Sequence, residues 1–172
     1  MDIGAGVARG EPVAEREADL ADLFDRHYDA LRRLAYVLLR DVATAEEVAM
    51  EAFARVLTVW GRVRQMDAPE LYLRKIVVNL CRSRWRRLQM EWKANRVAPE
   101  ARAWVPPVDA DHLDLWDAVD RLPLRQKQCV VLRYLDDLSE PGIAEVLQIP
   151  LGTVKTNLHR ARLKLAAELG EP

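Results

Sequence analysis

Two short helices joined by a tight turn are predicted by residues 140–162, which read EPGIAEVLQIPLGTVKTNLHRAR. Such a helix-turn-helix needs a small residue where its helices cross, apolar residues beside it, and an apolar anchor on the second helix. Ala144 is the small residue, Ile149 fills the turn, and Val154 is the anchor. The first helix is expected to begin after Ser139, a residue type that caps helices.

The second of these helices carries a face of hydrogen-bond donors. A step of 100° per residue separates a buried stripe from an outward face. The stripe consists of Val154, Leu158, Ala161 and Leu165, and the outward face consists of Lys155, Thr156, His159 and Arg160. Donors of this kind suit base edges and phosphates in a DNA groove. The alternative is an ordinary helical hairpin with a solvated basic edge.

The chain has a net charge of −1 and a pI of about 6.3, but it contains two strongly basic segments. Residues 74–96 hold 8 basic residues and one acidic residue, and residues 153–166 hold 4 basic residues and no acidic one. By contrast, residues 1–51 carry a net charge of −6 and residues 98–120 a net charge of −5. Because salt screens charges beyond about 10 Å, a local patch matters more to a nucleic acid than the total. Each segment can also be read as a solvated helix face.

The composition excludes several classes of protein. Half of the 172 residues are hydrophobic and 31% are charged, which is typical of a folded, soluble chain. No apolar run approaches the roughly 20 residues of a membrane span, and residues 1–13 lack the pattern of a secretory signal, so we expect a cytoplasmic protein. Cys81 and Cys129 have no second cysteine or spaced histidine beside them, so no metal site or cofactor is expected.

Helical periodicity dominates the rest of the chain. Long helices are predicted over residues 17–40, from a capping box of Thr44 and Glu47 up to Gly61, and over residues 69–95. Prolines and acidic residues then interrupt the pattern, and shorter helices follow. The predicted fold is all-α with two small helical domains. Its parts are a flexible N-terminal extension (1–16), a three- or four-helix bundle (17–96), an acidic, proline-containing linker (97–111) and a helix-turn-helix domain (112–172).

The basic helix over residues 69–95 has a regular polar face. Lys75, Asn79, Arg82 and Arg86 recur at steps of four, three and four. Asparagine is a mediocre helix former, so Asn79 indicates a side chain kept for hydrogen bonding, although an exposed asparagine without a role fits as well. Tryptophans in or near this segment could stack on unpaired bases or belong to the core, which is the commoner role; they are Trp60, Trp85 and Trp92.

These segments together resemble a bacterial RNA polymerase sigma factor of the extracytoplasmic-function type over about 145 positions. Residues 23–60, with Ala45-Glu46-Glu47-Val48, resemble the polymerase-binding part of sigma region 2. Residues 72–80, which read YLRKIVVNL, resemble its promoter-melting part. Residues 122–162 resemble sigma region 4. In this family Gln148 stands where glycine is common, so we expect it to adopt a left-handed conformation, and we expect Pro141 to lie in the first turn of its helix.

The resemblance implies a subunit without catalytic groups that binds core polymerase, through the clamp coiled coil of its largest subunit and its flap, and directs it to promoters. The residues it assigns to the −10 element are Lys75, Asn79, Arg82, Arg86 and Arg87, with the loop 61–68 as the wall of a base pocket. Those it assigns to the −35 element are Lys155, Thr156, His159, Arg160 and Arg162. Those it assigns to the clamp are Glu46, Glu47 and Glu51. An anti-sigma factor is a further expected partner.

Two rival functions are open to the sequence. A free-standing helix-turn-helix repressor or activator would bind its promoter without polymerase, as a dimer on two half-sites. An enzyme is disfavoured because the three histidines, His27, His112 and His159, have no partner at a recognisable catalytic spacing. The sequence leaves open how the two domains pack in the free chain, which promoter is read and which signal acts.

Overall fold

The structure is a computed structural model, and it describes residues 13–95 and 113–170. Every element within these two ranges is a helix, which confirms the predicted all-α class. None of these helices is long and apolar enough to cross a membrane. The first twelve residues of the expected extension, the predicted linker, His112 and the side chain of Trp92 lie outside the described residues.

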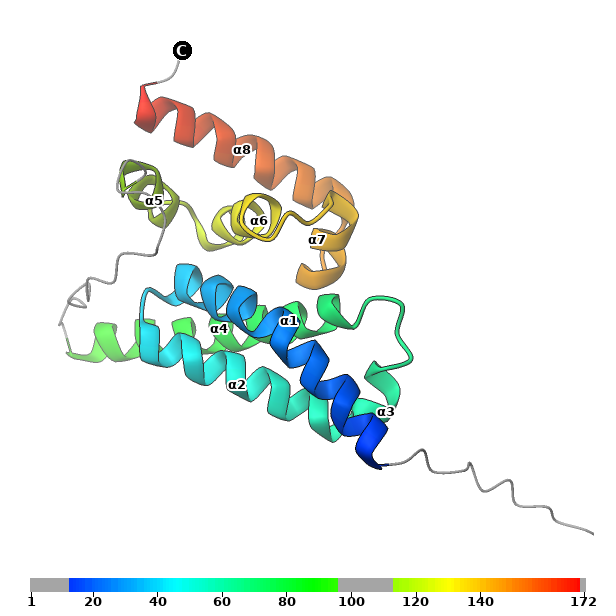
Figure 1. The fold of residues 1–172 in the computed structure, drawn as a ribbon. Helices are drawn as coiled ribbons and strands as arrows, with labels where there is room; N and C mark the ends of the chain where they lie inside the picture. Colours follow the sequence, from blue (N-terminus) through cyan, green and yellow to red (C-terminus); the bar gives the residue numbers. More distant parts are fainter. Residues whose placement is uncertain (1–12, 96–112, 171–172) are drawn as a thin grey trace, which may run out of the picture.

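The first domain is a bundle of three long helices and one short one. Its elements are α1 (Val13–Leu39), α2 (Val42–Thr58), α3 (Trp60–Val63) and α4 (Pro69–Asn95). The three long helices pack against one another (Figure 1). Leu34, Val48 and Val77, one from each, are fully buried where their apolar stripes meet. Burial of this apolar surface, at about 25 cal/mol per Å², stabilises the bundle.

The start and the end of α2 differ from the prediction. Asp41, not Thr44, is the N-cap: its Oδ1 accepts a hydrogen bond of 2.7 Å from the backbone N–H of Thr44. The capping box of Thr44 and Glu47 is therefore wrong, because Thr44 already lies inside the helix. Gly61 does not end α2 either. The chain leaves the helical conformation at Val59, where φ is −123°, and Gly61 lies within α3. In addition, α1 begins four residues earlier than expected.

The second domain contains the predicted helix-turn-helix. Its elements are α5 (Leu113–Asp120), α6 (Leu124–Tyr134), α7 (Glu140–Leu147) and α8 (Leu151–Leu169). Ser139 caps α7, since its Oγ accepts a 3.2 Å hydrogen bond from the N–H of Gly142, and Pro141 lies in the first turn as expected. Gln148 ends α7 in the left-handed conformation, with φ 54° and ψ 48°, which confirms that expectation. Ile143 and Val154 pack in the core between α7 and α8.

The two domains pack against each other in this structure. In Figure 1, α6 lies between α8 and the first domain, and α7 lies over the N-terminal end of α4. Seven consecutive residues of α6, 126–132, are buried, and at 100° per residue they cover every face of that helix. The sequence left this packing open, and the structure shows that it encloses α6.

Candidate nucleic-acid interfaces

The outward face of α8 is the first candidate interface. Lys155, Thr156, His159 and Arg160 are all exposed, whereas Val154, Leu158 and Ala161 are buried. The predicted division of this helix into two faces is therefore confirmed for these residues, whereas Leu165, the last residue of the predicted stripe, is only partly buried. Ser139, Gln148 and the α7–α8 packing fix the direction of α8, so its exposed donors project from a rigid support. The Oγ1 of Thr156 donates to the carbonyl oxygen of Gly152 at 2.9 Å, which orients this hydroxyl along the helix.

Arg162 is also exposed on α8, and its side chain contacts a neighbouring helix. Its Nε donates to the Oη of Tyr134 at 3.1 Å, so the side chain leans towards α6. It borders an open apolar groove of about 700 Å³ between α5, α6 and α8, which includes Trp116, Leu135 and Leu165. The structure thus places Arg162 beside this groove, two residues after Arg160 on the same helix.

The basic face of α4 is the second candidate interface. Lys75, Asn79 and Arg82 are half-buried, whereas Arg86 and Arg87 are exposed. Asn79 accepts a 3.0 Å hydrogen bond at Oδ1 from Arg82, so the two side chains form one polar unit. Partial burial, together with the nearby guanidinium groups of Arg125 and Arg86, lowers the pKa of Arg82 from its ordinary value.

An open hollow of about 560 Å³ adjoins the N-terminal part of this face. Its lining residues are Gln65, Met66, Asp67, Ala68, Leu71, Tyr72, Lys75 and Glu145. The first four come from the loop that the resemblance assigned to a pocket wall, and the next three come from the start of α4. Glu145 comes from α7 of the other domain. The hollow brings Lys75 and the loop together, whereas Asn79, one turn further along α4, is not among its lining residues.

The tryptophans divide between core and surface. Trp60 is 5% exposed and belongs to the core, which supports the structural interpretation of this residue. Its indole Nε1 is buried without a hydrogen-bond partner in the part of the chain that the structure describes. Trp85 is half-buried on α4. Trp60 is therefore unavailable for stacking on a base, and Trp85 presents only part of its ring.

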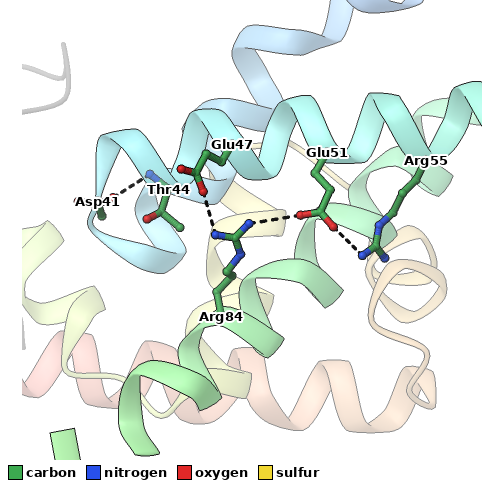
Figure 2. A network of polar contacts seen from close by, with 6 residues as sticks. All are labelled: Asp41, Thr44, Glu47, Glu51, Arg55 and Arg84. Atoms are coloured by element: carbon green, nitrogen blue, oxygen red, sulfur yellow. Dashed lines mark hydrogen bonds and ion pairs between the residues drawn. The ribbon is translucent and has the colours of Figure 1, made fainter. Parts of the chain in front are cut away.

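The acidic residues of α2 form a third candidate surface, shown in Figure 2. Arg84 of α4 donates to Glu47 at 2.9 Å and to Glu51 at 3.3 Å, and Arg55 donates to Glu51 at 2.7 Å. Partial burial alone would raise the pKa of Glu51, but the hydrogen bonds from Arg55 and Arg84 outweigh it, so this pKa lies below its ordinary value. Glu46 lies nearer Arg32, at 3.8 Å.

Sequence reasoning missed the partner of this acidic surface. Arg84 was counted only as part of a basic segment, yet it lies 37 residues from Glu47 and 33 from Glu51 along the chain. Nothing in the local pattern distinguishes it from Arg86 or Arg87. Among the side chains of residues 13–95 and 113–170 that the structure describes, no group of three or more metal-ligating residues comes together.

Comparisons with known proteins agree with the two-part architecture. Residues 23–90 match the family model described as Sigma-70 region 2, and residues 112–165 match the model described as Sigma-70, region 4. The RNA polymerase sigma-E factor of Streptomyces antibioticus is 33% identical over 166 residues, which cover 95% of this chain and 88% of that protein. The ECF RNA polymerase sigma factor SigW of Bacillus subtilis is 31% identical over 164 residues, covering 87% and 88%.

Two solved structures share the fold. The sigma factor RpoE of Bartonella quintana, in complex with the anti-sigma factor NepR, has a TM-score of 0.79 at 22% identity and covers 89% of this chain and 98% of its own. CnrH, in complex with the cytosolic domain of CnrY, has a TM-score of 0.64 at 20% identity and covers 91% and 94%.

Proposed function

The chain belongs to the sigma-70 family, as a sigma factor of the extracytoplasmic-function type, and from that premise we propose how it selects a promoter. It is an alternative sigma factor, which binds core RNA polymerase and directs promoter-specific initiation, rather than a free-standing repressor. The observation that carries this function is the presence of region 2 and region 4, in that order, in one chain. The domain roles follow, with residues 17–96 for the −10 element and 112–172 for the −35 element.

The exposed face of α8 reads the −35 element in the major groove. Its four donors, Lys155, Thr156, His159 and Arg160, leave the helix on the side opposite the buried Val154. A bidentate contact from an arginine to guanine contributes about 1–3 kcal/mol of discrimination. Arg162 is the phosphate contact of this set. Its bond to Tyr134 holds it beside the groove rather than over the bases, which fits a contact to the backbone.

The basic face of α4 binds the opened −10 strand. Lys75, Arg82, Arg86 and Arg87 contact phosphates, and Asn79 hydrogen-bonds a base turned out of the stack. The hollow beside Lys75 has room for a nucleobase. Extruding a base costs a few kcal/mol of stacking, which phosphate contacts and pocket contacts offset.

The acidic residues of α2 contact the clamp of the polymerase. Glu47 is 62% exposed, and its pair with Arg84 contributes only about 0–1 kcal/mol to stability. A basic side chain of the polymerase can therefore share the exposed carboxylate of Glu47 with Arg84. Glu46 and Glu51 extend the same surface. We assign the flap of the polymerase to the apolar groove around Trp116, because that groove is open and its lining is mostly apolar.

Three further assignments rest on the family alone. An anti-sigma factor binds the chain, as NepR and the cytosolic domain of CnrY bind the two structural neighbours. The chain carries no catalytic group, since its relatives are sigma factors, and the chemistry is that of polymerase. It acts in the cytoplasm, where polymerase and promoter are found.

Reconstitution with core polymerase tests the proposed function. Run-off transcription from a promoter library should yield defined start sites only when the chain is added, and the enriched promoters should share two elements. A Glu47→Lys, Glu51→Lys variant should lose polymerase binding while retaining its helical content. Sequence-selective binding of the free chain to an intact promoter, with no effect on polymerase, would favour the repressor instead.

A further inference from the structure

The groove between α5, α6 and α8 has the chemistry of a site for a proline-containing segment. Its volume is about 700 Å³, and aliphatic side chains of the three helices form most of its lining. Two aromatic side chains, Trp116 of α5 and Tyr134 of α6, also line it, and Tyr134 is 61% exposed. Aromatic-lined apolar grooves bind extended proline-rich segments, because such segments are already ordered before they bind. The groove therefore favours a segment that combines proline with large apolar residues.

A single positive charge lies at this groove. Arg162 is the only charged residue among the lining residues that the structure describes. Its Nε donates to the Oη of Tyr134 at 3.1 Å, which holds the guanidinium group beside the aromatic ring. Complementary charges fix the partner and the register of a contact. An occupant with a carboxylate next to its apolar residues would therefore match both features of the groove.

The part of the chain that leads into α5 has this composition. Residues 103–108 read AWVPPV, and residues 109–111 read DAD. These residues lie outside the part of the chain that the structure describes. Helix α5 begins at Leu113, two residues before Leu115, the first residue of the groove lining. The five peptide units between residue 108 and Leu113 span at most about 18 Å. The apolar run is therefore tethered beside the groove.

Tethering makes even a weak contact effective. A segment joined to its site by a short flexible linker acts at an effective concentration of about 1 mM. A segment whose dissociation constant as a free peptide is about 0.1 mM then occupies its site in about nine molecules out of ten. Such docking needs neither polymerase nor DNA, so it is a property of the free chain.

We propose that residues 103–108 dock in this groove of the free chain. The two prolines pack on Trp116 and Tyr134. Asp109 pairs with Arg162. A partner that uses the same groove has to displace the segment, so it binds about tenfold more weakly than it would bind an empty groove. The proposal goes beyond the function given above and does not depend on it, because the segment docks whether or not the flap binds there.

Competition with a separate peptide tests this proposal. The probe is a fluorescein-labelled peptide of residues 102–111, and fluorescence anisotropy follows its binding to the full chain. Trp104→Ser with Pro106→Ser removes one large apolar side chain and one proline from the tethered segment, without changing its charge or length. The matched control, Val97→Ser with Pro99→Ser, makes the same kind of change earlier in the linker.

We expect the peptide to bind the Trp104→Ser, Pro106→Ser variant about tenfold more tightly than the natural chain or the control, because only that variant has an empty groove. Adding Arg162→Glu to this variant should weaken the binding again, since the peptide is acidic at residues 109 and 111. Equal binding to all the chains, binding to none of them, or binding that Arg162→Glu leaves unchanged overturns the proposal.

A second measurement uses the otherwise natural chain and distinguishes docking within one chain from docking between two copies. A nitroxide on Ala101→Cys should broaden the methyl NMR signals of Leu135 and Leu165 in the groove, but not that of Leu57, which is exposed on α2. The native cysteines are buried and should remain unlabelled. Absent broadening, or broadening of nitroxide-free copies in a mixture, overturns the proposal. Neither measurement contains polymerase or DNA, so run-off transcription decides the proposed function separately.

Discussion

Replacing Gln148 by glycine is expected to stabilise the helix-turn-helix. Gln148 has φ 54° and ψ 48°, a left-handed conformation that costs a residue with a Cβ about 1–2 kcal/mol. Its side chain is exposed, so its removal sacrifices little packing. Glycine loses more backbone entropy on folding than alanine does, and this costs about 0.5–1 kcal/mol of stability. Gln148→Gly should therefore raise the free energy of unfolding by about 0.5–1 kcal/mol.

Gln148→Ala is the matched control, because it removes the same side chain but retains the Cβ. For a chain of this size, 1 kcal/mol corresponds to about 2–4 °C in melting temperature. Thermal unfolding followed by circular dichroism should therefore place Gln148→Gly about 1–4 °C above Gln148→Ala. Lys155→Gly, at an exposed position inside α8, should lower the melting temperature. A glycine variant at residue 148 that melts below the alanine variant would refute this reasoning.

The remaining predictions concern recognition of the −35 element, opening of the −10 element and the stability of the protein. Arg160→Ala should weaken discrimination at one −35 base pair by about 1–3 kcal/mol in competitive run-off transcription; unchanged promoter preference would remove its assignment. Asn79→Ala should retain duplex docking but fail in strand opening, and normal permanganate reactivity would contradict this. Leu158→Ala, at a site 1% exposed, should cost about 2–5 kcal/mol in urea unfolding. Burial raises the pKa of Cys81 to about 12 and that of Cys129 to about 11 from 9.0. Unfolded thiols ionise first, so the free energy of unfolding should fall as pH rises above about 9, and alanine at both positions should flatten that fall.

Features set by neighbouring residues were predictable. Helix α4 spans Pro69–Asn95, as its start signal and apolar spacing predict. The cap at Ser139 and the left-handed Gln148 follow from the geometry of one tight turn. The start of α2 shows the limit of such local reasoning. Asp41 and Thr44 are both capping residue types three positions apart, and the pattern of apolar residues did not separate them.

Contacts between distant segments were not predictable. Arg74 and Asp136 are 62 residues apart, and neither stands out among its charged neighbours. Glu47 was expected to cap its own helix, but Arg84 of α4 takes its carboxylate. A charge count locates basic segments but does not say which charges meet in space, because many pairings have similar local patterns. The division of α8 into two faces succeeded because a single helix determines it.

Arg84 also has a consequence for where transcription begins. Its guanidinium joins Glu47 and Glu51, on successive turns of α2, to the middle of α4 (Figure 2). On the proposed assignments, Arg84 thereby connects the helix that binds the polymerase to the helix that holds the melted strand. The offset from the −10 bases to the catalytic centre would then be set inside this bundle. Arg84→Met removes this connection. Transcripts should then start at several neighbouring nucleotides instead of one, even where promoter choice is unaltered.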